Sequence, residues 1–215
     1  MNSFAWPAVT AAAVSAALHL RAVYRSPPWQ VYLFKPLTTT ILLALAVVST
    51  SAHGPRYQWA VVLGLACSLA GDVFLMLPRD RFIAGLSSFL VAHLAYLAAF
   101  STGVPLGTAP ALAIPLVAVS IPLLRILWPG LGTLRAPVLL YTAAILAMVW
   151  QAGARAWMLP TPGAALAAAG AVLFMTSDAI LAVNRFRRPF TRAQALIMSS
   201  YVAAQALIAC SVGVR

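Results

Sequence analysis

Residues 58–77 read QWAVVLGLACSLAGDVFLML and contain one charged side chain, that of Asp72. A run of about 20 apolar residues has the length that a helix needs to cross the hydrocarbon core of a bilayer. The short basic segment PRDR follows at 78–81, and residues 82–100 are again apolar. This stretch predicts two membrane-spanning helices that are joined as a tight hairpin.

The same pattern recurs along the whole chain, which is 63% hydrophobic and 8% charged. A water-soluble fold of this size cannot bury so much apolar surface, because it must cover its core with polar groups. We therefore expect an all-α integral membrane bundle of about eight transmembrane helices, forming a single domain over residues 1–215. The predicted spans are 4–20, 37–52, 58–77, 82–100, 108–127, 137–158, 163–183 and 194–213.

The basic residues lie between these spans and indicate how the chain is oriented. Eleven of the 14 Lys and Arg residues follow the odd-numbered spans, and only Arg56, Arg155 and Arg215 lie on the other side. Because cytoplasmic loops carry an excess of Lys and Arg, we expect both termini outside and the odd loops in the cytoplasm. Topology thus accounts for the net charge of +11 without a nucleic-acid partner, for which no basic patch with exposed aromatic residues is evident.

Two stretches of the chain look like copies of one another. Residues 71–75 (GDVFL) are similar to residues 177–181 (SDAIL), and each stretch is followed by a basic turn and a phenylalanine. Lys35-Pro36 precedes the first stretch much as Ala136-Pro137 precedes the second. A repeat unit of four spans returns the chain to the same side, so we expect a parallel 4+4 internal repeat whose axis lies along the membrane normal.

The repeat places Asp72 and Asp178 at matching depths, roughly 8 Å inward from their basic loops at 1.5 Å per residue. A carboxylate within a spanning helix is costly and usually marks a functional path. The structural alternative is that each aspartate only pairs with a base, such as Lys35 or Arg135, and holds helices together. We expect the two carboxyls to converge in one cavity that faces the cytoplasm.

Other polar residues in the spans are candidates for the wall of this cavity. His93 and Tyr96 share a face of the fourth span, and the hydroxyl of Ser68 lies one turn before Asp72. Each has a structural reading as well, since a lone histidine or a small hydroxyl often only packs between helices. Lys35 is the first choice for holding a substrate phosphate, with Arg135 as its counterpart in the second half.

Metal and serine chemistry find little support in the sequence. The three histidines are too scattered for a zinc site, and no Gly-x-Ser-x-Gly motif is present. We expect no metal and no cofactor, and a magnesium ion bound by carboxylates stays open as the alternative.

The combination of these motifs resembles the lysoplasmalogenase family, also called the YhhN-like family. The resemblance covers the chain from about residue 30 to the C-terminus. Its matching stretches are Lys35 to Thr38, Gly71 to Leu75, Gly85 to His93 with Tyr96, Ser177 to Leu181, and Tyr201 to Gln205.

The resemblance implies a multi-pass protein of the cell membrane, in a bacterium the inner membrane, that acts on a lysophospholipid. It implies hydrolysis of the vinyl-ether bond of lysoplasmalogens to a fatty aldehyde and a glycerophospho-alcohol. The two aspartates of the family map onto Asp72 and Asp178, and Tyr201 and Gln205 join the predicted wall of the site.

Two carboxyls suit this reaction, because vinyl ethers are stable to base and cleaved by acid. One aspartate would donate a proton while the other stays ionised, as in glycosidases, and the sequence does not assign which is which. Two other functions stay open: a small proton-coupled transporter that uses the same aspartates, and a lipid-binding protein without a reaction. The apolar outer faces suit contact with membrane lipids, in a monomer or a homodimer.

Overall fold

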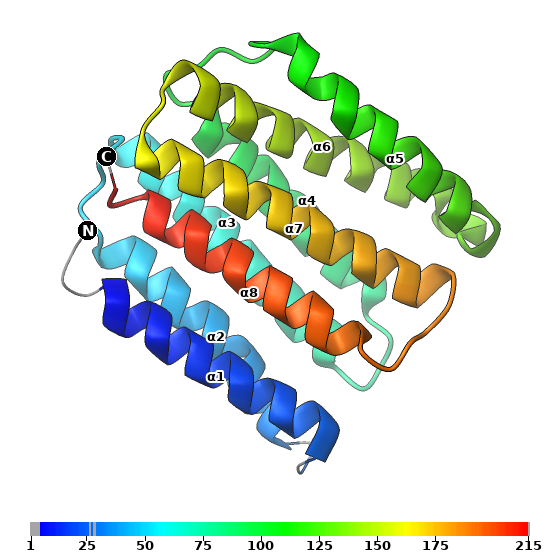
Figure 1. Ribbon diagram of the computed structural model, residues 1–215. Helices are drawn as coiled ribbons and strands as arrows, with labels where there is room; N and C mark the ends of the chain where they lie inside the picture. Colours follow the sequence, from blue (N-terminus) through cyan, green and yellow to red (C-terminus); the bar gives the residue numbers. More distant parts are fainter. Residues whose placement is uncertain (1–4, 26, 28, 215) are drawn as a thin grey trace.

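The protein is an all-α bundle, described by a computed structural model over residues 5–25, 27 and 29–214 (Figure 1). Over these residues the chain forms eight α-helices and no strand. Three short 3-10 helices, η1 (Pro110–Leu112), η2 (Trp128–Gly130) and η3 (Gly132–Leu134), flank α5. The α-helices are α1 (Ala5–Arg25), α2 (Trp29–Val48), α3 (Pro55–Met76), α4 (Phe82–Phe100), α5 (Ala113–Leu127), α6 (Arg135–Met158), α7 (Pro162–Phe186) and α8 (Ala193–Ser211).

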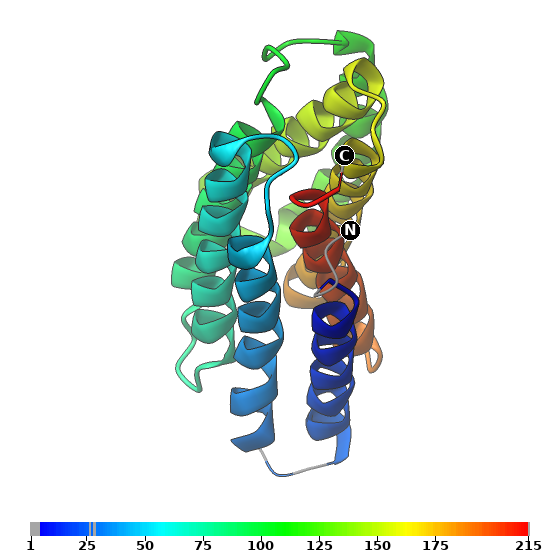
Figure 2. The same cartoon turned by 90° about the vertical axis from the view of Figure 1, so that its left-hand side faces the viewer.

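Seven of the helices form a closed ring. Each packs against the next in the order α1, α2, α3, α4, α6, α7 and α8, and α8 returns to α1. Figure 2 shows α1 and α2 side by side at one edge of the bundle. The helix α5 lies outside the ring and packs mainly against α6 and α7. The predicted helical bundle is therefore confirmed, and its fifth helix is peripheral.

In the part of the chain that the structure describes, seven helical segments are long and apolar enough to cross a membrane, in agreement with a multi-pass membrane protein. They include every predicted span except the first. The helix α1 has 21 residues, but His19 and Arg21 lower its hydropathy and it is not among the seven. Its crossing of the membrane therefore stays a prediction, and the first residue of that predicted span, residue 4, lies outside the described residues.

The start of α2 differs from the prediction. We expected Lys35-Pro36 to open this helix near residue 37, but the helix begins at Trp29 and Pro36 lies inside it. Proline removes one backbone donor, and neighbouring helices can satisfy the freed carbonyl in a membrane bundle. The helix is thus about two turns longer at its N-terminus than predicted, and Lys35 lies within it and not in a loop.

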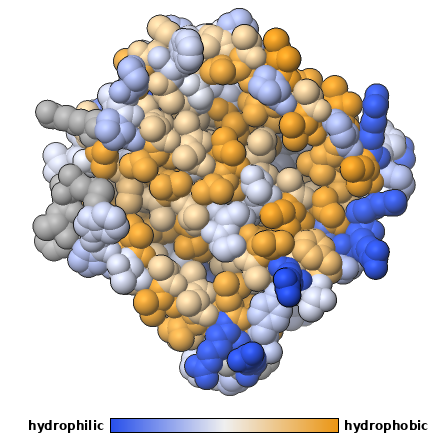
Figure 3. Space-filling model, in the orientation of Figure 1, coloured by the Kyte–Doolittle hydropathy of each residue, from blue (hydrophilic) through white to orange (hydrophobic). Residues whose placement is uncertain are grey.

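The eleven basic residues that were assigned to odd-numbered loops gather at one end of the molecule. The connections after α1, α3, α5 and α7 lie at this end, opposite the end where α1 begins and α8 ends (Figure 1). Figure 3 shows the hydrophilic side chains at the same end and a largely apolar surface along the helices. The cytoplasmic location of this basic end, the single domain and the oligomeric state stay predictions.

Glycines allow the helices of the two tightest hairpins to approach closely. A Cβ atom on Gly64 of α3 would lie 2.3 Å from the Tyr96 ring of α4. A Cβ on Gly170 of α7 would lie 2.9 Å from the backbone oxygen of Ala204 in α8. Small residues at such crossings are the usual means by which membrane helices pack, because lipid gives no hydrophobic drive between them.

The Gly170→Ala variant should be less stable than the wild type by about 1–3 kcal/mol, because the added methyl group meets backbone atoms that cannot rotate away. Gly153→Ala is the matched control, since its Cβ would find only the Leu112 side chain at 3.5 Å. That variant should be neutral or slightly stabilising. Thermal unfolding in mild detergent measures both, and equal midpoints for the two variants would contradict the packing.

Candidate functional site

Asp72 lies near the basic end of α3 and is 2% exposed. Its Oδ2 atom accepts hydrogen bonds of 2.7 Å from the hydroxyls of Thr39 and Tyr201. Its Oδ1 atom lies 3.5 Å from the Nζ atom of Lys35. The carboxyl of α3 is thus held by two residues of α2 and one of α8, and all three contacts stabilise its charged form.

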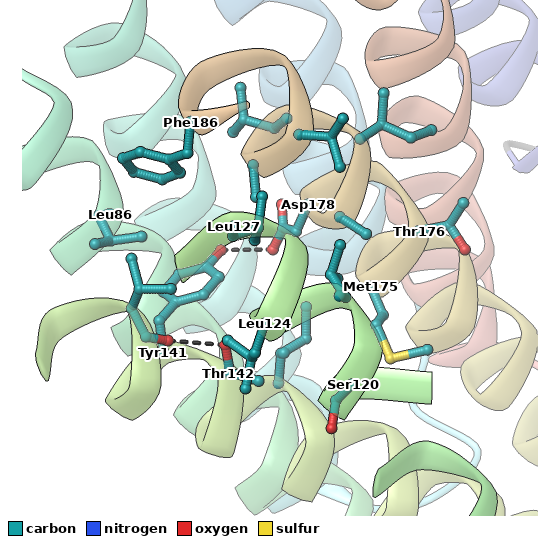
Figure 4. A pocket seen from close by; sticks show the side chains of 18 of the residues that line it. Leu86, Ser120, Leu124, Leu127, Tyr141, Thr142, Met175, Thr176, Asp178 and Phe186 are labelled. Carbon is teal, nitrogen blue, oxygen red and sulfur yellow. Dashed lines mark hydrogen bonds between the residues drawn. The ribbon is translucent and has the colours of Figure 1, made fainter. Parts of the chain in front are cut away.

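Asp178 lies on α7 and has different partners. The Tyr141 hydroxyl of α6 donates a hydrogen bond of 2.5 Å to its Oδ2 atom (Figure 4). The Nε2 atom of His93 lies 3.5 Å from the same oxygen. Among the residues that the structure describes, no Lys or Arg lies within ion-pair distance of this carboxyl. The two aspartates therefore occupy environments of different charge.

The contacts cross between the two halves of the chain. Tyr201 belongs to the α7–α8 hairpin and bonds Asp72 of α3, whereas His93 belongs to the α3–α4 hairpin and faces Asp178 of α7. The aromatic ring of Phe174 lies between them, with its centroid 4.7 Å from that of His93 and 5.5 Å from that of Tyr201. This crossing brings the two predicted carboxyls to one region of the bundle.

Both aspartates line one polar cavity of about 390 Å³ near the basic end. Lys35 and Tyr201 also line it, so four of the residues proposed from the sequence meet there. Its remaining polar lining residues are Asp80, Arg81, Ser177, Asn184, Arg185 and Gln194.

A second cavity of about 390 Å³ adjoins the first and is almost entirely apolar. It lies between α4, α5, α6 and α7, and Figure 4 shows Leu86, Leu124, Leu127 and Met175 pointing into it with Asp178 and Tyr141. Residues that line both cavities are Leu75, Phe82, Phe89, Asp178 and Leu181. Among the residues that the structure describes, Asp178 is thus the one titratable side chain found in both linings.

The other predicted residues are not among the residues that line these cavities. Ser68, His93, Tyr96 and Gln205 are completely buried and line neither cavity. The Tyr96 hydroxyl donates to Oε1 of Gln205 at 2.7 Å, and the Ser68 hydroxyl has no hydrogen-bond partner. Tyr96 and Gln205 thus bond each other inside the bundle and His93 faces Asp178, and a direct role for the four residues in binding a substrate stays a prediction.

Arg135 does not occupy the place that the repeat predicts for a counterpart of Lys35. Its guanidinium lies 4.8 Å from the ring centroid of Trp128 and is exposed at the start of α6. The side chains next to Asp178 do not bond its carboxyl either. Thr176 donates to the Val172 carbonyl and Ser177 to the Ile197 carbonyl, because their positions on α7 face other neighbours.

An exposed ion pair closes the rim of the polar cavity. The guanidinium of Arg185 bonds the carboxyl of Asp80, which also accepts a hydrogen bond from the backbone N–H of Phe82. The Arg185 contact, together with this N–H, holds the pKa of Asp80 below its ordinary value. The ion pair therefore stabilises the folded protein at pH values above the pKa that Asp80 has in the unfolded chain. This stabilisation is lost as the pH falls through the lower pKa of the folded protein. At neutral pH Asp80 is charged.

The comparisons with known proteins agree with this architecture. The profile of the YhhN family matches residues 30–212. The chain belongs to the YhhN family. An uncharacterised membrane protein YhhN of Escherichia coli is 34% identical to it over 92% of the chain and 94% of that protein.

Mammalian proteins are similar to the chain at about the same identity. A lysoplasmalogenase TMEM86B of Sus scrofa is 32% identical over 86% of the chain and 76% of that protein. A lysoplasmalogenase TMEM86A of Bos taurus is 35% identical over 86% of the chain and 79% of that protein. No solved structure matches the chain.

The structure adds residues to the site of this YhhN-family protein that the sequence had not singled out. Thr39 and Tyr141 are the hydroxyl donors to the two aspartates. Aligning Pro36 with Pro137 in the predicted repeat places Leu140, and not Tyr141, opposite Thr39, so the repeat alone does not identify Tyr141 as a donor. Among the described residues, no group of three or more His, Cys, Asp or Glu side chains could hold a metal ion.

Lys35→Met should lower the free energy of unfolding by about 3 kcal/mol, because it leaves the Asp72 carboxylate buried without its cation. Adding Asp72→Asn should recover most of that loss, since the double variant no longer buries a charge. Denaturant unfolding of the wild type, the two single variants and the double variant gives the free energy of interaction between the two side chains. Additive losses would mean that the two side chains do not form an ion pair.

Proposed function

We propose that this protein is a membrane hydrolase that cleaves the vinyl-ether bond of lysoplasmalogens, releasing a fatty aldehyde and a glycerophospho-alcohol. Two kinds of support converge. Relatives at 32–35% identity are named lysoplasmalogenases. The observation that carries the proposal is that Asp178 lines both an apolar cavity and a polar cavity that contains Asp72.

A lysoplasmalogen has one apolar chain, a vinyl-ether bond at its end, and a polar glycerophosphate. The apolar cavity suits the hydrocarbon chain of the substrate, because its leucine, valine and phenylalanine side chains offer the same apolar surroundings as the lipid tails of the membrane. The polar cavity suits the glycerol and the phosphate. The vinyl ether then lies where the two cavities meet, beside Asp178.

The different partners of the two aspartates suggest how the roles are divided. Burial disfavours a charged carboxyl unless a cation or hydrogen-bond donors offset the cost. Asp72 has Lys35 and two hydroxyl donors, so it is the carboxylate of the pair. Asp178 has a single tyrosine donor and a histidine, so it is the carboxyl that keeps a proton and serves as general acid.

The reaction then follows from acid-base chemistry. Asp178 gives its proton to the β-carbon of the vinyl ether, and the resulting oxocarbenium ion is stabilised by the charge of Asp72. Water adds to this ion and gives a proton to Asp72, forming a hemiacetal. Collapse of the hemiacetal returns the proton of Asp72 to the leaving glycerol oxygen and the hydroxyl proton to Asp178. One water is consumed, and both aspartates regain their starting state.

Asp72→Asn and Asp178→Asn should each lower the rate of aldehyde release by about a hundredfold or more, the range that general acid-base catalysis contributes. The measurement uses the reconstituted protein with a lysoplasmenyl lipid and, for comparison, an ester lysolipid. Tyr57→Phe is the control, because its buried hydroxyl bonds Ser211 at the opposite end of the bundle.

The competing functions give different results in the same vesicles. A proton-coupled transporter would move protons with a solute and release no aldehyde. A lipid-binding protein would keep its affinity in both Asn variants and release no aldehyde. Full turnover in either Asn variant, with unchanged thermal stability, would contradict the role of the two aspartates.

In heavy water, the released aldehyde should carry one deuterium on the carbon next to the carbonyl, because the mechanism protonates that carbon. Mass spectrometry of the aldehyde, trapped as an oxime, measures the label. Unlabelled aldehyde incubated with the Asp178→Asn protein corrects for exchange in solution. Aldehyde released without the label would exclude proton transfer to carbon as a step.

A further inference from the structure

The polar cavity is lined by three basic and three acidic side chains, which are not all paired with one another. Three basic side chains line it, those of Lys35, Arg81 and Arg185. Two of them have a carboxylate partner: Lys35 lies 3.5 Å from Asp72, and Arg185 bonds Asp80. Within the described ranges 5–25, 27 and 29–214, Arg81 forms no ion pair. Among the described residues that line the cavity, Arg81 is therefore the one base without an ion-pair partner, and its charge can meet a ligand.

Arg81 lies where it could bind the polar end of the substrate, in the same cavity as Asp178 but outside the apolar cavity. Arg81 directly precedes Phe82, whose side chain lines both the polar and the apolar cavity. The same polar cavity reaches Asp178, where the two cavities meet. An anion held by Arg81 would thus lie in the cavity that receives the polar end of a substrate whose chain occupies the apolar cavity.

We propose that Arg81 binds the phosphodiester of the lysophospholipid headgroup, an inference that rests on the proposed function. A phosphodiester carries a single negative charge, which matches the single unpaired cation. The planar guanidinium suits this ligand, because two of its N–H groups can bond two phosphate oxygens at once. Lys35, which the sequence favoured for the phosphate, is engaged by Asp72 and holds that carboxylate instead.

The test measures binding without turnover, so that it can succeed or fail independently of the hydrolase proposal. The probes are a lysophospholipid with a saturated ether chain, which has no vinyl-ether bond to cleave, and the 1-alkylglycerol of the same chain, which lacks the phosphate. Both are titrated into the protein in nanodiscs of neutral lipid. The quantity of interest is the ratio of their dissociation constants.

The wild type should bind the phosphate-bearing probe more tightly, and Arg81→Gln should reduce this preference about tenfold, with little change for the alkylglycerol. Arg81→Lys should retain part of the preference, because it keeps the charge and loses the planar donor pair. Arg79→Gln is the matched control, since this arginine lies in the same turn and does not line the cavity.

Three outcomes would overturn the inference. One is an unchanged preference in Arg81→Gln. Another is an equal loss in Arg79→Gln, which would reflect the general positive potential of this surface. The third is competition by inorganic phosphate at the same concentration as the lipid probe, which would indicate a site for free phosphate instead of a headgroup.

Discussion

The hydrogen-bonded carboxylate of Asp72 is the interaction on which the site depends. A buried charge in a membrane bundle is stable only when its partners are fixed in place, and here they come from α2 and α8. The same contacts therefore connect α8 to the consecutive helices α2 and α3, and Lys35, Asp72 and Tyr201 all line the polar cavity. Because Asp72 engages Lys35, we propose Arg81 and not Lys35 as the base that binds a substrate anion.

The two aspartates are alike in sequence and unlike in surroundings. Lys35, Thr39 and Tyr201 surround the first, and Tyr141 and His93 face the second. The crossing of Tyr201 and His93 between halves is the pattern expected from a two-fold relation, and it supports the predicted repeat, which stays a prediction. Divergence of the two environments would allow one ancestral position to supply both an acid and a base.

Much of the fold was predictable, because apolar runs of about 20 residues separated by basic turns indicate membrane helices. The hairpin 58–100 was predicted from such local signals, and the two aspartates do meet at one cavity as expected, while their role in a reaction stays a prediction. The start of α2 was wrong, because Pro36 suggested a helix boundary that the bundle does not need. The roles of Thr39, Tyr141 and Arg81 could not be predicted in this way, since each depends on which residue of another helix lies opposite.

The position of α5 outside the ring has a consequence for how such proteins can diverge. The aspartates and their donors all reside on ring helices, whereas α5 contributes part of the wall of the apolar cavity. If the protein acts as proposed, substitutions on this one helix would change the length or bulk of the apolar chain that fits, while the aspartates and their donors stay in place. A peripheral helix would then allow substrate range to change during evolution without loss of the reaction.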